Sequence, residues 1–297
     1  MSGPEPVILD GGMSNALEGL GHDLSDPLWT ARVLRDAPEA VAEVHRRYYR
    51  AGAQVATAAS YQASVPGFID QGLLPAEASA LLIRSIEVAR EVRDELAVDG
   101  VDRWVAASIG PYGAVLADGS EYRGRYGVTA ARLRDFHGPR LELLASAGPD
   151  LIAVETIPDI DEAEVLVDLL YDIDLPTWFS FSARDGRTAA GQPLTDAFAT
   201  AAAPTTVVAV GVNCCPADQV LDAVRLAVEV GKKKAVAYPN GGGEWDARAR
   251  AWVGTPGVDA DLARSWADAG AAYLGGCCRV GPADIERLVA ALDPRAP

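Results

Sequence analysis

Residues 274–281 read Leu-Gly-Gly-Cys-Cys-Arg-Val-Gly, and they follow an apolar run, residues 271–274, that is typical of a buried strand. The other two cysteines of the chain, Cys214 and Cys215, are also adjacent and end a second apolar run, residues 207–213. All four cysteines therefore lie at the ends of two predicted strands. Thiolates that converge from separate strand ends are typical of a metal site, and three thiolates that leave one position open would make a reactive one.

Around these two runs, the chain repeats a short apolar run followed by a helical pattern eight times. The predicted strands are residues 7–9, 55–60, 104–109, 151–156, 177–182, 207–214, 235–238 and 272–276. The predicted helices are residues 38–50, 75–98, 129–147, 161–172, 194–202, 217–230, 258–269 and 282–292. Eight such units without a linker predict an α/β fold, a (β/α)8 TIM barrel, as a single domain over residues 1–297. A doubly wound open sheet is the alternative, but eight regular units favour closure.

The loops of this predicted barrel differ in length between its two ends. Segments from helix to strand, such as residues 51–54 and 148–150, are short. Segments from strand to helix are long at residues 110–128, 184–193 and 240–257. Such barrels carry their active sites in the loops at the C-terminal ends of the strands, and both cysteine pairs fall at that end. The sulfurs of the sixth and eighth strands can therefore converge there.

Adjacent residues on a regular strand point to opposite faces of the sheet. The strand must therefore break before Cys277 and Cys278 if both are to bind one ion, and we expect Gly275 and Gly276 to provide the backbone freedom for this break. The alternative is that each cysteine is a small buried hydrophobic residue. Two pairs at the end with the long loops favour the metal site.

The pair Cys214 and Cys215 is expected to behave differently, because Pro216 restricts Cys215 to an extended backbone. These two side chains should not share a face, so we expect only one of them to be a metal ligand. The three histidines of the chain, at positions 22, 45 and 137, are scattered and are interpreted as surface or helix residues. Three thiolates without an imidazole favour activation of a bound thiol over activation of water.

Composition limits the classes of function. The chain has 297 residues, 49% hydrophobic and 23% charged, and 26 basic against 42 acidic residues give a net charge of −16. This charge disfavours a nucleic-acid partner. No secretory signal and no membrane span are expected from the sequence, which favours a cytoplasmic location with reduced thiols.

The sequence resembles the homocysteine S-methyltransferase family over nearly its whole length. Five blocks carry this resemblance: Leu-Asp-Gly-Gly-Met at 9–13, Asp-Pro-Leu-Trp at 26–29, Thr-Ala-Ala-Ser-Tyr-Gln-Ala-Ser at 57–64, Ser-Ile-Gly-Pro-Tyr at 108–112 and Glu-Thr-Ile-Pro at 155–158. Residues 211–214 (Gly-Val-Asn-Cys) and 275–278 (Gly-Gly-Cys-Cys) are similar to the family's zinc-ligand motifs. By this resemblance Cys214, Cys277 and Cys278 are the implied Zn²⁺ ligands, and Cys215 is an extra residue beside the motif.

The resemblance also implies a reaction. A methyl group would pass from a sulfonium donor, S-methylmethionine before S-adenosylmethionine, to the thiol of homocysteine, giving methionine. The three-cysteine zinc site would activate the substrate thiol by lowering its pKa. Betaine is a less expected donor, because this compact chain lacks the extra C-terminal segment of the betaine-using branch. A folate and cobalamin route would need further modules.

Three polar residues are candidates for substrate binding. Glu155 ends the fourth strand, and its carboxylate is expected to pair with the amino group of homocysteine; an exposed acidic residue is the alternative. Asp10 is expected to bind substrate, with capping of the turn at Gly11-Gly12 as the alternative. Asn213 is expected near the ligand cysteine or the substrate, with hydrogen bonding to buried backbone as the alternative.

Tyrosines near the active end could face a cationic sulfonium, because an aromatic ring attracts a cation. They are residues 61, 112, 122, 126 and 238, and none is singled out. The expected partners are small molecules, homocysteine and a sulfonium donor, acting on a monomer or small homo-oligomer. Two alternatives stay open: a methyltransferase of the same family that uses another thiol or a selenol, and a non-catalytic zinc-binding or thiol redox protein. The second would need a closed four-sulfur site or oxidisable cysteine pairs.

Overall fold

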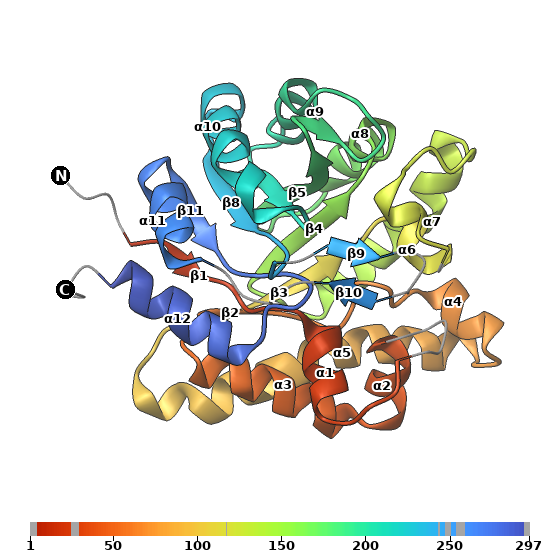
Figure 1. Ribbon diagram of the computed structural model, residues 1–297. Coiled ribbons are helices and arrows are strands. Elements are labelled where there is room, and N and C mark those ends of the chain that lie inside the picture. The colour runs from red at the N-terminus through yellow and green to blue at the C-terminus, as the bar shows by residue number, and fades with distance from the viewer. Residues whose placement is uncertain are drawn as a thin grey trace.

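The computed structural model describes residues 5–24, 30–116, 118–242, 244–246, 251–253 and 259–293. Within these residues, eight parallel strands form a barrel with helices around it (Figure 1). The strands are β1 (Val7–Ile8), β2 (Val55–Thr57), β3 (Trp104–Ile109), β4 (Leu151–Ile157), β5 (Thr177–Arg184), β7 (Val207–Asn213), β8 (Lys234–Tyr238) and β11 (Ala271–Leu274). Their order is β1-β11-β8-β7-β5-β4-β3-β2, and a parallel bridge between Leu9 and Val55 joins the two ends. The predicted (β/α)8 barrel is confirmed.

Each of the eight predicted helices is present, with ends that differ by a few residues. They are α3 (Pro38–Arg50), α5 (Pro75–Leu96), α7 (Ala130–Ser146), α8 (Ile160–Leu170), α9 (Leu194–Ala201), α10 (Val220–Gly231), α11 (Ala260–Asp268) and α12 (Pro282–Leu292). In Figure 1, α12 at the end of the chain lies beside α3 near its start, and β1 pairs with β11, so the two ends of the sequence meet in the barrel. Of the helices described, none combines the length and apolar composition that a bilayer span requires.

The loops after the strands contain short elements that the sequence did not predict. They are α1 (Met13–Gly19), α2 (Thr30–Asp36), α4 (Val65–Asp70), α6 (Tyr112–Leu116), the 3₁₀ turn η2 (Ser120–Tyr122), β6 (Arg187–Thr188), β9 (Glu244–Asp246) and β10 (Ala251–Val253). The first residues of the helix predicted over 217–230 form a 3₁₀ turn, η3 (Ala217–Gln219). Elements this short do not show a full hydrophobic period in the sequence. The block at 26–29, Gly243 and the predicted helix start at 258 lie outside the described residues.

The core has two layers, because alternate residues on each strand point into the barrel or out to the helices. The fully buried Trp178 belongs to the inner layer, where it packs in one cluster with Leu9, Val55 and Val236. A larger cluster fills the space between strands and helices. Gly211 has no room for a side chain, since a Cβ there would lie 1.9 Å from the carbonyl oxygen of Val236. The barrel interior is thus filled, and it supports whatever lies at the strand ends.

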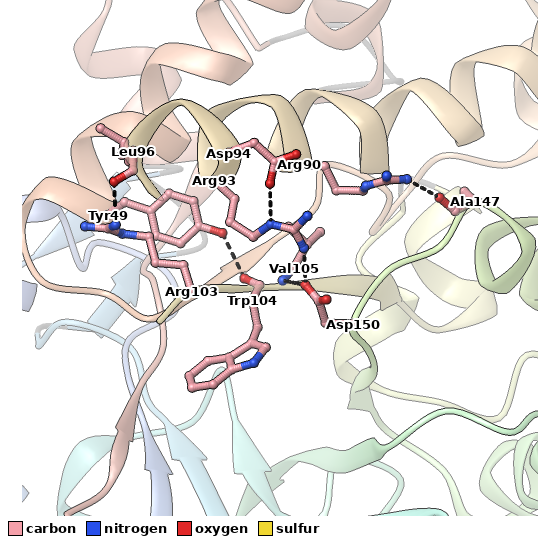
Figure 2. Close-up of polar contacts among 10 residues, drawn as sticks. All are labelled: Tyr49, Arg90, Arg93, Asp94, Leu96, Arg103, Trp104, Val105, Ala147 and Asp150. Atoms are coloured by element: carbon pink, nitrogen blue, oxygen red, sulfur yellow. Dashed lines mark hydrogen bonds and ion pairs between the residues drawn. The ribbon is translucent and has the colours of Figure 1, made fainter. Parts of the chain in front are cut away.

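The N-terminal ends of the strands are held by paired charges (Figure 2). Arg93 of α5 donates to Asp150 Oδ2 at 2.7 Å, and the same oxygen accepts from the backbone N–H of Val105 at 2.7 Å. Tyr49 donates to the carbonyl of Trp104 at 2.8 Å. These contacts attach β3 to the helices on its outside, so this end of the barrel has a structural role.

Candidate metal and substrate site

Three of the four cysteines meet at the C-terminal end of the barrel. β7 ends at Asn213, and Cys214 follows with a φ of 50°, which turns its side chain away from the strand direction. β11 ends at Leu274, so the expected break before Cys277 and Cys278 is present. The Sγ atoms of Cys214, Cys277 and Cys278 all lie within 4.8 Å of one another. This spacing allows one ion to contact all three sulfurs.

Gly275 and Gly276 are needed for a reason other than the expected one. Neither has a positive φ. A Cβ on Gly275 would lie 2.6 Å from the Cβ of Leu9, and one on Gly276 would lie 2.1 Å from Cγ1 of Val280. The glycines therefore allow close packing of the segment against β1 and against the turn after the cysteines; the expectation of backbone freedom is corrected.

Cys215 lies apart from the three clustered thiols. It is 3% exposed and packs in the outer core layer, where burial raises the pKa of its thiol to about 12. The expectation that Cys214 and Cys215 would not share a face is confirmed. A closed four-sulfur site would need Cys215 to leave the core.

The three clustered thiols differ in how readily they lose their protons. Hydrogen bonds with Cys214 and Cys277 lower the pKa of the Cys278 thiol, and the bond with Cys214 has the larger effect. The pKa of Cys277 is raised by its hydrogen bonds with Cys214 and Cys278 and by burial. One thiolate is thus favoured and the others are opposed, because like charges at this spacing repel. A cation among the three sulfurs would remove this opposition.

Glu155 of β4 is buried, 7% exposed, so it is not the exposed acidic residue of the alternative interpretation. It accepts hydrogen bonds from the hydroxyl of Ser108 and from Tyr238 Oη, the latter at 3.1 Å. Tyr238 Oη in turn accepts from Trp178 Nε1 at 3.0 Å in the inner core. Burial raises the pKa of Glu155 to about 7. These hydrogen bonds hold the carboxyl in place, and a cation beside it would stabilise its charged form.

Asp10 follows β1 and is 5% exposed. Its carboxylate accepts from the backbone N–H of Thr57 at 2.7 Å and from the Thr57 hydroxyl at 2.9 Å. These bonds run to the end of β2 rather than to the turn at Gly11 and Gly12. Burial raises its pKa to about 8, and the charge of Glu155 contributes to the rise.

Asn213 uses its amide within the protein. Its Oδ1 accepts from Thr156 N at 2.7 Å and from Ser180 Oγ at 2.8 Å, and its Nδ2 donates to Thr156 Oγ1 at 2.7 Å. Thr156 has a φ of 61°, an unfavourable value for a β-branched residue. Asn213 therefore stabilises the backbone that follows Glu155. This matches the alternative interpretation, hydrogen bonding to buried backbone.

The long loop after β3 brings one residue of η2 to the thiols and buries the residue before it. Tyr122 Oη lies 3.6 Å from Cys214 Sγ. Glu121 is 3% exposed, and burial raises its pKa. The sequence named Tyr122 among five candidate tyrosines but missed Glu121. The length of this loop in the sequence indicated that it could contribute to the site. Its conformation, and therefore the position of Glu121, could not be predicted from the sequence.

That loop is fixed from outside by a buried carboxylate. Glu162 at the start of α8 accepts from the backbone N–H of Tyr112 at 2.6 Å and from Tyr126 Oη at 3.0 Å, and it lies 2.8 Å from His137 Nε2. Arg140, fully surrounded by protein, donates to the carbonyls of Gly110 at 2.9 Å, Ser60 at 2.7 Å and Tyr61 at 2.6 Å. His137, interpreted from sequence as a surface or helix residue, is buried on α7. These contacts hold the loops after β2 and β3 over the site.

The fold and the site together define a (β/α)8 barrel with a three-thiol cluster and buried carboxylates at the C-terminal ends of its strands. Residues 7–292 match the model of the homocysteine S-methyltransferase family. Homocysteine S-methyltransferase 1 of Zea mays is 45% identical, over 95% of this chain and 93% of its own length. Homocysteine S-methyltransferase of Escherichia coli (strain K12) is 43% identical, over 96% of this chain and 94% of its own length.

The solved structures agree with the sequence comparison. The crystal structure of the E. coli homocysteine methyltransferase MmuM in its metallated form matches with a TM-score of 0.86 and 42% identity, covering 97% of this chain and 96% of the other. The chain belongs to the homocysteine S-methyltransferase family and is an enzyme of the methyltransferase class.

Proposed function

We propose that this methyltransferase transfers a methyl group from S-methylmethionine, or from S-adenosylmethionine, to the thiol of homocysteine, giving methionine. Residues 1–297 would act as one homocysteine-binding barrel domain. The observation that carries the proposal is the meeting of Cys214, Cys277 and Cys278 from two strand ends, with sulfurs within 4.8 Å of one another. The E. coli relative has a crystal structure in a metallated form, which supports a bound metal in this enzyme.

The donor set fits Zn²⁺. Three sulfurs with a fourth position left for substrate are typical of reactive zinc sites, and Cys215 in the core does not complete a fourth. When bound, zinc would lower the pKa of the substrate thiol, so that its sulfur is a nucleophile at neutral pH. The metal would also draw all three cysteines into the thiolate form.

Asp10 and Glu155 would bind the amino-acid part of homocysteine. Glu155 is oriented by Ser108 and Tyr238, and Asp10 is held by Thr57. A substrate ammonium group would supply the cation that these buried carboxyls need, and it would lower the pKa of each. Asn213 would act as a positioning residue for the backbone after Glu155.

Methyl transfer needs little further chemistry from the protein. A lone pair on the homocysteine sulfur forms the new S–CH₃ bond while the S–CH₃ bond of the donor breaks. The donor sulfur keeps that electron pair and leaves as a neutral sulfide, so no general acid is required. The main contribution of the loops after β2 and β3 would be to align the two sulfurs.

The test is methionine formation from homocysteine, with the two donors supplied separately and the zinc content measured in parallel. Cys277→Ala is expected to lose zinc and turnover, while the matched variant Cys215→Ala keeps both. Full turnover by metal-free protein, or by Cys277→Ala, would overturn the zinc site. Zinc binding without methionine formation from either donor would overturn the assignment of homocysteine and the sulfonium donors.

A further inference from the structure

Glu121 is a buried acidic residue of the loop that contacts the thiol cluster, and none of the roles given above uses it. It lies in the 3₁₀ turn η2. The next residue of this turn, Tyr122, places its hydroxyl 3.6 Å from Cys214 Sγ. The turn is packed tightly there, because a Cβ on Gly113 would lie 2.6 Å from the backbone nitrogen of Glu121. The position of Glu121 is thus set by the loop backbone.

The carboxylate of Glu121 is short of partners. Among the residues that the structure describes, no hydrogen-bond donor reaches its buried Oε2 atom. The charged groups facing it are Asp118, Arg123 and Cys278, and of these the exposed Arg123 is the one cation. Glu162, under the same loop, shows the contrast, because it accepts hydrogen bonds from two other residues and lies beside His137. Leaving a buried carboxylate oxygen without a donor is costly unless a ligand supplies one.

The substrates of the proposed reaction carry such a donor. Homocysteine brings one ammonium group, for which Asp10 and Glu155 at the ends of β1 and β4 are already placed. Both sulfonium donors bring a second ammonium group on their own amino-acid part. A sulfonium centre has no N–H or O–H to offer Oε2, whereas an ammonium group has three N–H donors.

We infer that Glu121 is a substrate-binding residue that accepts a hydrogen bond from the ammonium group of the methyl donor. The inference rests on the proposed function. It assigns the two ammonium groups to different elements: the acceptor's to the strand ends, the donor's to the loop after β3. The ammonium charge does not change during methyl transfer, so this contact stabilises ground state and transition state alike and acts on KM rather than on kcat.

The experiment compares Glu121→Gln with wild type and with Asp118→Asn, an exposed acidic residue of the same loop whose side chain is 55% exposed. With S-methylmethionine as donor, we expect Glu121→Gln to raise the donor KM about 10- to 100-fold, the range for a lost charged hydrogen bond. The KM for homocysteine, kcat and zinc content should stay within about twofold of wild type. Asp118→Asn should leave the donor KM unchanged.

Two further measurements separate binding from a structural role. Dimethylsulfonioacetate, a sulfonium without an ammonium group, should inhibit wild type and Glu121→Gln equally. The thermal midpoint of the substrate-free variant should stay the same or rise, because the substitution removes an unpaired buried charge. A lowered midpoint, an unchanged donor KM, or a raised homocysteine KM would overturn the inference. If wild type forms no methionine, the proposed function fails instead, and calorimetric titration of the zinc-loaded proteins with S-methylmethionine then decides whether Glu121 binds the donor.

Discussion

The carboxylates at the two ends of the barrel have different partners. At the N-terminal ends of the strands, Asp150 Oδ2 accepts hydrogen bonds from Arg93 and from the backbone N–H of Val105 (Figure 2). At the C-terminal ends, Asp10 and Glu155 accept hydrogen bonds from neutral groups only, among those described, and burial raises the pKa of both. The charge of Asp150 is thus balanced by Arg93, whereas Asp10 and Glu155 have no cationic hydrogen-bond partner among the described residues.

This difference favours the C-terminal ends of the strands as the functional end, without reference to any relative. Unbalanced charge in a protein interior destabilises the folded state, so it persists where a ligand balances it. The thiol cluster follows a similar logic: its neighbours lower the pKa of Cys278 but raise that of Cys277, so a cation would be needed to ionise all three sulfurs. The comparison therefore predicts that substitutions at the two ends will have different consequences.

The largest effect is expected from the thiols. Cys278→Ala should lower kcat/KM by more than the roughly 100-fold that follows loss of an outer-shell contact at a metal site. Zinc content should fall well below one ion per chain, because two sulfurs remain. Zinc analysis and initial rates measure this, and Cys215→Ala, with a buried sulfur outside the cluster, is the control. Equal losses in the two variants would mean that all four sulfurs bind the metal.

Next in size is the carboxylate at the end of β4. Glu155→Gln keeps the shape of the side chain and removes its charge, so we expect the KM for homocysteine to rise about 10- to 100-fold. Its free energy of unfolding should stay the same or increase, since a buried charge is lost. Kinetics with varied homocysteine and denaturant unfolding measure the two quantities. A less stable enzyme with normal KM would make Glu155 a structural residue.

A matched substitution at the N-terminal ends of the strands should lower stability and leave substrate binding unchanged. Asp150→Ala leaves Arg93 and the Val105 N–H without their partner, which should cost about 1–3 kcal/mol of unfolding free energy. Both KM values should remain those of wild type, because this end lies away from the site. Urea unfolding tests the first part, and a change in either KM would contradict the second.

The raised pKa values of Glu155 and Asp10 should make the stability of the folded protein depend on pH. The folded-state pKa values of Glu155 and Asp10 are raised to about 7 and about 8, so the folded protein holds protons that unfolded carboxyls have released. The metal-free, substrate-free protein should therefore lose on the order of 1 kcal/mol or more as pH rises from about 6.5 to about 8. Burial lowers the pKa of His45 to about 4, so this residue adds little slope in that window. Asp10→Asn should flatten the slope, and a slope unchanged in this variant would exclude Asp10 as its source.

The smallest effect is expected from Tyr122→Phe. This change removes the hydroxyl that lies 3.6 Å from Cys214 Sγ but keeps the ring, so kcat/KM should fall about 2- to 10-fold. Zinc content should not change. A loss as large as that of a cysteine variant would show that the hydroxyl has a direct role in the reaction.

The sequence predicted the barrel and the thiol cluster because both depend on repeated, local signals. Apolar runs alternate with helical periods, and each cysteine pair directly follows such a run. In a parallel barrel the C-terminal ends of the strands lie at one end, and only β8 separates β7 from β11, so the approach of Cys214 to Cys277 and Cys278 follows from topology.

The sequence did not predict the loop that brings Glu121 to the site, for a physical reason. The conformation of residues 110–128 depends on contacts with distant residues, such as Glu162 to Tyr112 and Arg140 to Gly110, which leave no periodic trace. The role of Gly275 was misjudged for a similar reason, because the atom that excludes a side chain there belongs to Leu9, far away in sequence.

The most direct test of the central claim is X-ray absorption at the zinc edge, recorded with and without homocysteine. Three cysteine sulfurs with an open position predict three sulfur neighbours and one lighter atom in the substrate-free protein, and four sulfurs once homocysteine is bound. Four sulfur neighbours before substrate is added, or no change on its addition, would contradict the account.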